Sequence, residues 1–201
     1  MTISDAPRQR RNIEPDAAGK LVAAGLDCLA TSGVPGFTVE ALCQRAGVSY
    51  EAFHRCFADT GQLLASVYEA AYQPMLGILG PQAGPLGLWP LIERIFDVEG
   101  RDHRTFRIWL ALWGEMAVNP ALMRAHRRNY WHYRAVVEGA IAAHCLGRGL
   151  QPDAGALAAG VIGLVDGLWL EQCIDPEGFQ RQRAVDACLG MLAPVLGPLD
   201  A

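Results

Sequence analysis

The chain has 201 residues, of which 51% are hydrophobic and 19% are charged, and its net charge at pH 7 is -4. This composition excludes disorder over most of the chain and predicts a substantial core, in one large domain or in a small domain followed by a larger one. The negative net charge argues against a protein that coats nucleic acid by charge alone, so any contact with DNA needs a locally basic face.

The first eleven residues are polar and show no hydrophobic periodicity, and Arg8, Arg10 and Arg11 lie close together among them. We predict a flexible basic arm at 1–11. Guanidinium groups of such an arm can follow phosphates or enter a minor groove, where the negative potential is concentrated. The alternative, a tail that only keeps the protein soluble, fits equally well.

A helical pattern from Ala17 to Leu29 precedes a stretch, Thr38 to Phe57, that predicts two short helices joined by a sharp turn. Thr38 and Ser49 are placed to cap the two helices, and Gly47 can take the positive φ that ends the first. The apolar faces of the two helices are formed by Val39, Leu42, Cys43 and Ala46, and by Ala52, Phe53, Cys56 and Phe57.

The outer face of the second helix carries hydroxyl, aromatic, acidic, imidazole and guanidinium groups. They belong to Ser49, Tyr50, Glu51, His54 and Arg55. Such groups reach base edges and phosphates, which favours a helix-turn-helix. The alternative is that two helices of a bundle meet at a glycine and expose an ordinary solvated face.

The run from about residue 12 to 72 resembles the N-terminal domain of TetR-type transcriptional regulators. The matching segments are Gly36-Phe37-Thr38, Ala46-Gly47-Val48-Ser49, Phe53-His54-Arg55-Cys56-Phe57 and Leu63-Leu64. The resemblance implies a DNA-binding domain over residues 12–61, with Tyr50, His54 and Arg55 at the DNA and Thr38, Arg45 and Ser49 at phosphates.

Three positions depart from the family pattern. Glu51 stands where a small residue is usual, His54 where a tyrosine is common, and Thr60 where a lysine commonly meets the DNA backbone. DNA binding is therefore implied, while its strength and target stay open. Glu51 either accepts a hydrogen bond from a cytosine or favours the positive end of its helix, and the second interpretation is preferred.

Residues 62–201 are expected to form a helical domain for effector binding and dimerisation. Pro74 and the glycines and prolines from Gly77 to Gly87 predict the connection to it. Helices are expected from Leu88 to a break at Gly100, over about 103–118 and, with Asn119 and Pro120 as N-cap and first residue, up to about 145. The second of these is expected to present Phe106, Trp109, Leu110, Trp113 and Met116 on one face.

The helix after Pro152 is apolar nearly all round, so it should be buried on more than one side. Small residues recur in it every four positions, which lets another helix approach closely. A last helix, capped by Asp175 and Pro176, is expected to face inward with Val185, Cys188, Leu189, Leu192 and Val195. Because no stretch alternates with period two, the fold class is all-α, with about nine helices.

The second half also resembles the effector domain of the BetI-like branch of the TetR family, through Ile108 to Trp113, Asn119 to Leu122 and Gly163 to Leu170. The resemblance implies a homodimer held by the last two long helices and a ligand cavity among the middle helices. The predicted interface residues are Gly155, Ala159, Gly163, Gly167, Leu189 and Leu192. The predicted pocket residues are Phe96, Trp109, Trp113, Glu115, Tyr133 and Trp169.

Aromatic faces with a carboxylate can hold a quaternary ammonium such as choline, the ligand associated with the namesake of the branch. The alternative, preferred for most of these rings, is that they fill the core and the interface while Glu115 lies outside.

The sequence thus predicts a homodimeric transcriptional repressor that a small-molecule ligand releases from a palindromic operator. The alternative is a degenerate relative that has lost DNA binding and acts through a ligand or a protein partner. No HExxH, GxSxG, phosphate-loop or dinucleotide motif is present, so neither an enzyme, nor a cofactor, nor a metal site is expected. Six cysteines without paired spacing, and no signal peptide or long uncharged run, predict a cytoplasmic protein away from membranes.

Overall fold

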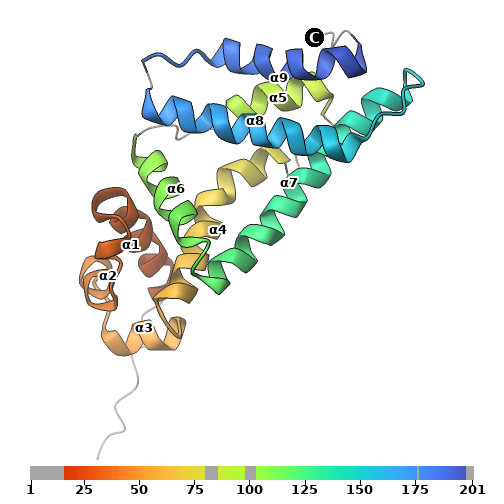
Figure 1. Ribbon diagram of the computed structural model, residues 1–201. Coiled ribbons are helices and arrows are strands. Elements are labelled where there is room, and N and C mark those ends of the chain that lie inside the picture. The colour runs from red at the N-terminus through yellow and green to blue at the C-terminus, as the bar shows by residue number, and fades with distance from the viewer. Residues whose placement is uncertain (1–15, 80–85, 98–102, 176, 198–201) are drawn as a thin grey trace, which may run out of the picture.

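The computed structural model describes residues 16–79, 86–97, 103–175 and 177–197, so the predicted basic arm lies outside the described residues. The described residues form nine α-helices, one 3-10 turn at Val34–Gly36 and no strand, which confirms the all-α fold (Figure 1). The helices are α1 Ala17–Ser32, α2 Val39–Ala46, α3 Tyr50–Cys56, α4 Thr60–Leu79, α5 Leu88–Phe96, α6 His103–Glu115, α7 Pro120–Leu146, α8 Ala154–Ile174 and α9 Arg181–Leu196.

Helices α1 to α3 form a helix-turn-helix unit whose local signals are all confirmed. The Thr38 hydroxyl accepts from the backbone N–H of Ala41 at 3.2 Å, and the Ser49 hydroxyl accepts from that of Ala52 at 3.1 Å. Gly47 has φ 65°, the left-handed conformation that ends α2 at little steric cost. The turn between α2 and α3 is therefore fixed by short-range contacts.

Helix α4 continues through Pro74 to Leu79, so the helix break expected at Pro74 is wrong. Proline removes one helical hydrogen bond and costs about 3 kcal/mol in a helix interior. Packing on both sides offsets that cost, because Tyr72 and Leu79 are buried and Met75 contacts both hydrophobic clusters of the protein. The helix thus links the two clusters.

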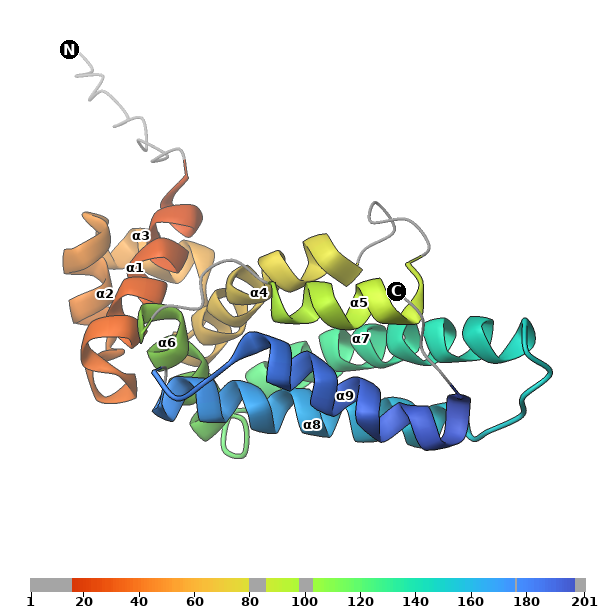
Figure 2. The ribbon, with the colours of Figure 1, turned by 90° about the horizontal axis from the view of Figure 1, so that it is seen from above.

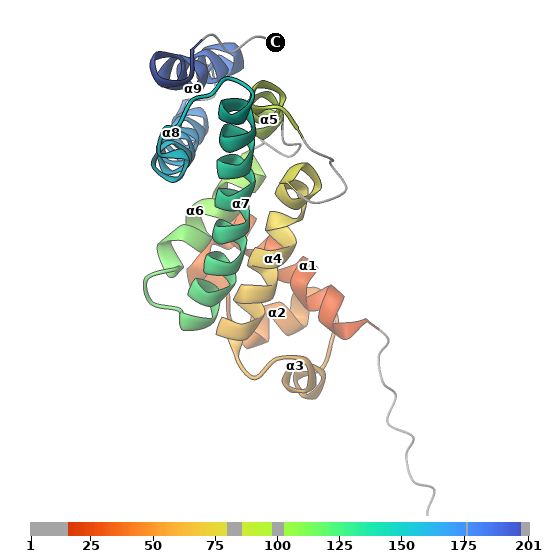
Figure 3. The same cartoon turned by 90° about the vertical axis from the view of Figure 1, so that its right-hand side faces the viewer.

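The buried residues form two hydrophobic clusters, and the predicted domain boundary at residue 61 stays a prediction. The first contains the helix-turn-helix unit, most of α4, the buried face of α6 and the first turns of α7. The second contains α5, α8, α9, the end of α4 and the rest of α7. Figures 1 and 3 show α4 and α7 running side by side between the two regions, and Figure 2 shows α5, α8 and α9 grouped beside α7. Helices α4 and α7 therefore contribute residues to both clusters.

Two expected helix faces are corrected. The buried residues of α6 are Ile108 and Leu112, which pack in the first cluster, whereas Leu110 is exposed. In α9, Val195 is 47% exposed, and the helix begins at Arg181 rather than after Asp175. The Asp175 carboxylate instead accepts from the N–H of Gly178, which holds a turn before the helix.

Candidate functional site

The outer face of α3 gathers the polar groups predicted to contact DNA. Tyr50 is 60% exposed, and Glu51, His54 and Arg55 are exposed beside it. The rings of Tyr50 and His54 lie edge to face with centroids 4.5 Å apart. Helix α3 lies at the end of the molecule farthest from α5, α8 and α9, so none of these three helices covers its outer face (Figure 1).

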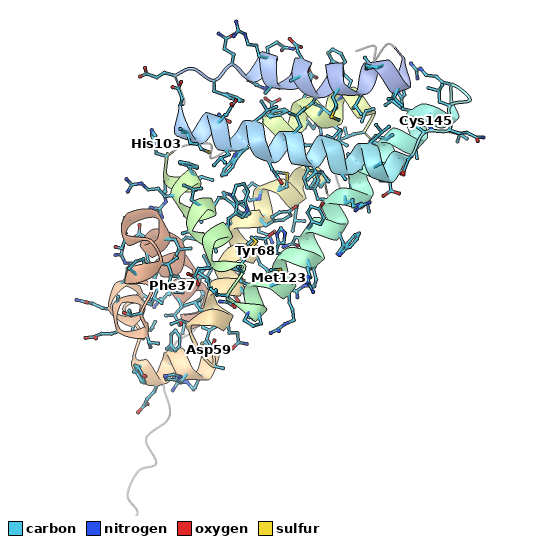
Figure 4. The ribbon with its side chains drawn as sticks, viewed as in Figure 1. Phe37, Asp59, Tyr68, His103, Met123 and Cys145 are labelled. Carbon is cyan, nitrogen blue, oxygen red and sulfur yellow. The ribbon has the colours of Figure 1, made fainter. Side chains whose placement is uncertain are left out.

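The predicted phosphate contacts next to α3 have defined local roles. Because the hydroxyls of Thr38 and Ser49 accept backbone hydrogen bonds as caps, each keeps its own proton to donate to a phosphate oxygen. Thr60 is the first residue of α4, and its neighbour Asp59 accepts from the N–H of Gln62 at 2.8 Å. Figure 4 shows Asp59 beside the end of α3, which places the start of α4 at the same edge of the molecule.

Arg45, in the last turn of α2, has a partner within the chain. Its guanidinium forms an ion pair with Asp27 of α1, which also accepts from Arg104 of α6 at 2.9 Å. Hydrogen bonds from Arg104 and Arg45 lower the pKa of Asp27. One carboxylate thus joins α1 and α2 of the DNA-binding unit to α6, and Arg45 serves this bridge in the free protein.

We expect Asp27→Asn to lower the free energy of unfolding by up to about 1 kcal/mol, because exposed ion pairs contribute little each. Since the pKa of Asp27 is depressed in the folded state, its contribution is present above the ordinary aspartate pKa and is lost as the pH falls further. Urea unfolding at low and high salt measures the loss, which salt should reduce. Glu177→Gln, which removes one exposed carboxylate from the loop before α9, is the control; an equal loss in both variants would show that the bridge contributes nothing.

A cavity of about 130 Å³ lies among α4, α5, α6, α7 and α8, with room on the order of ten water molecules. Five of the six predicted pocket residues line it: Phe96, Trp109, Trp113, Tyr133 and Trp169. Glu115, at the last turn of α6, does not line it. The tryptophans form one cluster, with the rings of Trp113 and Trp169 5.3 Å apart between centroids.

The carboxylate in the cavity is Asp166 of α8, which the sequence analysis missed. Its side chain is accessible, but the surrounding protein atoms desolvate it and raise its pKa to about 6. Burial raises the pKa of Tyr68, Tyr72 and Tyr133, which line the same cavity, and the nearby charge of Asp166 raises the pKa of each further. A lone acid within the apolar run GLVDGLWL was the available signal.

Other polar groups of the cavity come from α4 and α7. The Tyr68 hydroxyl and His126 Nδ1 share a hydrogen bond at 3.2 Å, and Figure 4 shows Tyr68 between these helices. Burial lowers the pKa of His126, so its imidazole is neutral at pH 7. The buried hydroxyl of Tyr133 has no hydrogen-bond partner among the described residues. No lysine or arginine of the described chain lines this cavity, so Asp166 sets its charge.

The predicted interface residues of α8 and α9 separate into two groups. A Cβ added at Gly163 or Gly167 would meet no atom within 4 Å, and Ala159 is exposed on the same helix. In contrast, Leu189 and Leu192 are buried inside the chain in the second cluster. Gly155 packs against the Arg134 side chain, where a Cβ would lie 3.3 Å from Nη2.

Helix α8 is also the one described helix that is long and apolar enough to cross a membrane by length and composition. Only 22% of its most apolar window is buried within the chain. Much of the surface of this apolar helix is therefore left uncovered by the described residues.

Comparison with known proteins identifies the family. Residues 88–197 match the model of the C-terminal domain of BetI-type transcriptional repressors. The chain is 28% identical over 187 residues to the HTH-type transcriptional regulator BetI of Yersinia pestis, covering 86% of this chain and 89% of that protein.

Solved structures show the same fold. A transcriptional regulator from Pseudomonas aeruginosa PAO1 is 27% identical and superposes with a TM-score of 0.82, covering 93% of this chain and 95% of that one. A regulator from Saccharomonospora viridis, solved in complex with choline, is 15% identical with a TM-score of 0.71, covering 88% and 95%. Since the family model spans more than half of the sequence, the chain belongs to the BetI-type transcriptional regulators of the TetR family and is not an enzyme.

Proposed function

We propose that this regulator is a homodimeric repressor that binds a palindromic operator through α3 and leaves it when a small organic cation occupies the cavity. The observation that carries the proposal is the shared use of α4 and α6. Both helices line the cavity, through Tyr72 and Trp109 among others, and both pack against α1 of the DNA-binding unit. A ligand that moves them therefore changes the position of α3.

At the DNA, Tyr50, His54 and Arg55 are the proposed contacts to bases and phosphates, supported by their common exposure on α3. Thr38, Ser49 and Thr60 are the proposed phosphate contacts at its edges. Glu51 lies in the first turn of α3, where a negative charge favours the positive end of the helix. Arg45 stays a further proposed phosphate contact, and in the free protein its guanidinium pairs with Asp27.

The ligand class follows from the lining of the cavity. Aromatic faces attract cations, and Asp166 supplies a negative charge without a basic partner in the lining. The choline complex of the Saccharomonospora viridis regulator supports a cation of this kind. A coupling free energy of about 1 to 3 kcal/mol between cavity and operator is enough for a useful switch.

The dimer is proposed to form across the open faces of α8 and α9, where Ala159, Gly163 and Gly167 present little side-chain volume. Two copies of α3 about one helical turn of DNA apart would read the two half-sites of a palindrome. Leu189 and Leu192 support this surface from inside the core.

We expect Gly163→Leu to raise the dimer dissociation constant by at least tenfold, because a leucine side chain there would separate two closely packed helix backbones. Sedimentation of the full chain over a range of low concentrations measures the change. Gly114→Leu on α6, where a Cβ also meets no atom within 4 Å, is the matched control. A Gly163→Leu variant that stays fully dimeric would contradict this interface.

The proposed function is tested by titrating labelled DNA from the region upstream of the gene with the protein, at two salt concentrations and with random DNA as competitor. Specific binding should resist the competitor and weaken steeply with salt, because guanidinium groups meet phosphates. Adding choline should then release the DNA. Weak binding that random DNA abolishes would contradict the repressor and favour the degenerate, partner-binding relative.

A further inference from the structure

Asp166 lies at the border between two faces of α8. Residues of a helix follow each other at about 100° around its axis, so Asp166 is flanked by Ile162 and Trp169 on one side and by Gly163 and Gly167 on the other. Ile162 and Trp169 line the cavity, whereas Gly163 and Gly167 have open space before them. Asp166 itself lines the cavity and is exposed in the single chain. The cavity therefore reaches the open face of α8 at this carboxylate.

We propose that the effector cavity is completed by the second subunit: a copy of the chain packed on the open face of α8 closes the cavity at Asp166, so that cation binding and dimerisation stabilise each other. The inference rests on the proposed function, which supplies both the dimer and the cavity. The inference adds a thermodynamic link between dimerisation and ligand binding, which neither the dimer nor the cavity requires by itself.

The second copy is the occupant that the open face fits. Helix α8 is apolar along its length but mostly unburied, and Ile174 near its end is 72% exposed. The open surface continues on α9, where Gly190 has no atom within 4 Å of an added Cβ and Val195 is exposed. Two adjacent helices with small and apolar exposed residues form a surface that an identical surface can cover around a two-fold axis.

Closing the dimer over Asp166 has an electrostatic consequence. The carboxylate already stands among aromatic side chains with no basic group in the cavity lining, and the partner would remove more of its water. Burying an unpaired charge is costly, so the empty dimer is weakened by Asp166. A cation in the cavity removes this cost, and by mass action a ligand that binds only the closed dimer strengthens it.

The test measures the dimer dissociation constant of the full chain by sedimentation, for the wild type and for Asp166→Asn, in choline chloride and in sodium chloride of equal ionic strength. Asp166→Asn should dimerise more tightly than the wild type in sodium chloride, on the order of tenfold. Choline should tighten the wild-type dimer several-fold and leave the variant unchanged. Glu40→Gln, which neutralises an exposed carboxylate on α2, is the control and should behave as the wild type.

Tryptophan fluorescence is recorded in the same samples, since Trp109, Trp113 and Trp169 line the cavity. Choline binding with an unchanged wild-type dimer constant would overturn this inference while leaving the proposed function intact. A dimer constant that Asp166→Asn does not change would overturn it as well. If the chain neither dimerises nor binds choline, the proposed function fails and this inference fails with it.

Discussion

Replacing Arg55 by alanine is expected to weaken operator binding by about 30-fold or more while leaving the fold intact. A well-formed contact to a base contributes about 1 to 3 kcal/mol, and a symmetric dimer loses two of them. The Arg55 side chain is exposed on α3 and has no hydrogen bond or ion pair to another described residue, so its removal breaks no such contact in the described part of the chain. The loss should therefore appear in DNA affinity and not in thermal unfolding.

The measurement is a fluorescence titration of upstream DNA at several salt concentrations. If Arg55 meets a phosphate, the slope of log affinity against log salt should fall by about two for the dimer. If Arg55 contacts a base, the Arg55→Ala variant should keep the slope of log affinity against log salt of the wild type. Its discrimination against random DNA should then fall. Arg94→Ala, which removes an exposed arginine of α5 far from α3, is the matched control. Equal affinity of wild type and Arg55→Ala would remove this residue from the DNA interface.

The helix-turn-helix could be predicted from the sequence because its determinants are local. The capping hydroxyls of Thr38 and Ser49 each accept from a backbone N–H three residues later in the chain. Gly47 ends α2 through its own backbone conformation. Short-range hydrogen bonds and helical periodicity are readable without any knowledge of tertiary contacts. The family pattern then supplied the proposal that the exposed face of α3 contacts DNA.

The features that were missed depend on contacts between distant segments. The ion pair of Arg45 could not be predicted from the pattern, because its partner Asp27 lies 18 residues earlier and is shared with Arg104 from α6. The phosphate contact of Arg45 stays a prediction. Pro74 marks a helix break by propensity, yet packing against both clusters keeps α4 continuous. The intrinsic helix propensity of a residue is outweighed wherever the burial of its neighbours contributes more free energy than the propensity costs.

The choice of Glu115 over Asp166 shows the same limit at the ligand site. Both are acids near tryptophans, and the sequence favoured the one within the tryptophan helix. Whether a side chain reaches the cavity depends on the rotation of its helix against the neighbouring helices. Trp109 and Trp113 of α6 face the cavity and Glu115 does not, whereas Asp166 enters it from α8. Only the packed arrangement decides between them.

The affinity of the cavity for choline is expected to fall by up to about tenfold as the pH is lowered from 8 to 5, because at pH 5 only about one tenth of Asp166 stays charged if its pKa is about 6. Desolvation raises the pKa of Asp166 to about 6, so its carboxylate is charged above that pH and increasingly neutral below it. Because only the charged form of Asp166 attracts the cation, the affinity for choline falls as the pH is lowered below this pKa. An ordinary exposed aspartate, with its pKa near 4, would give almost no change over this range.

The Asp166→Asn variant distinguishes the pH effect of this carboxylate from the pH effect of the other titrating group of the cavity. His126 also lines it, and its protonation at low pH would oppose a cation in the same direction, but its lowered pKa moves that effect to more acidic solution. The variant keeps His126, so any pH dependence that remains in it measures the imidazole. Tryptophan fluorescence titrations at pH 5, 6, 7 and 8 give both curves. Tight, pH-independent choline binding by Asp166→Asn would show that the aromatic rings alone hold the ligand, because cation–π attraction does not depend on this carboxylate.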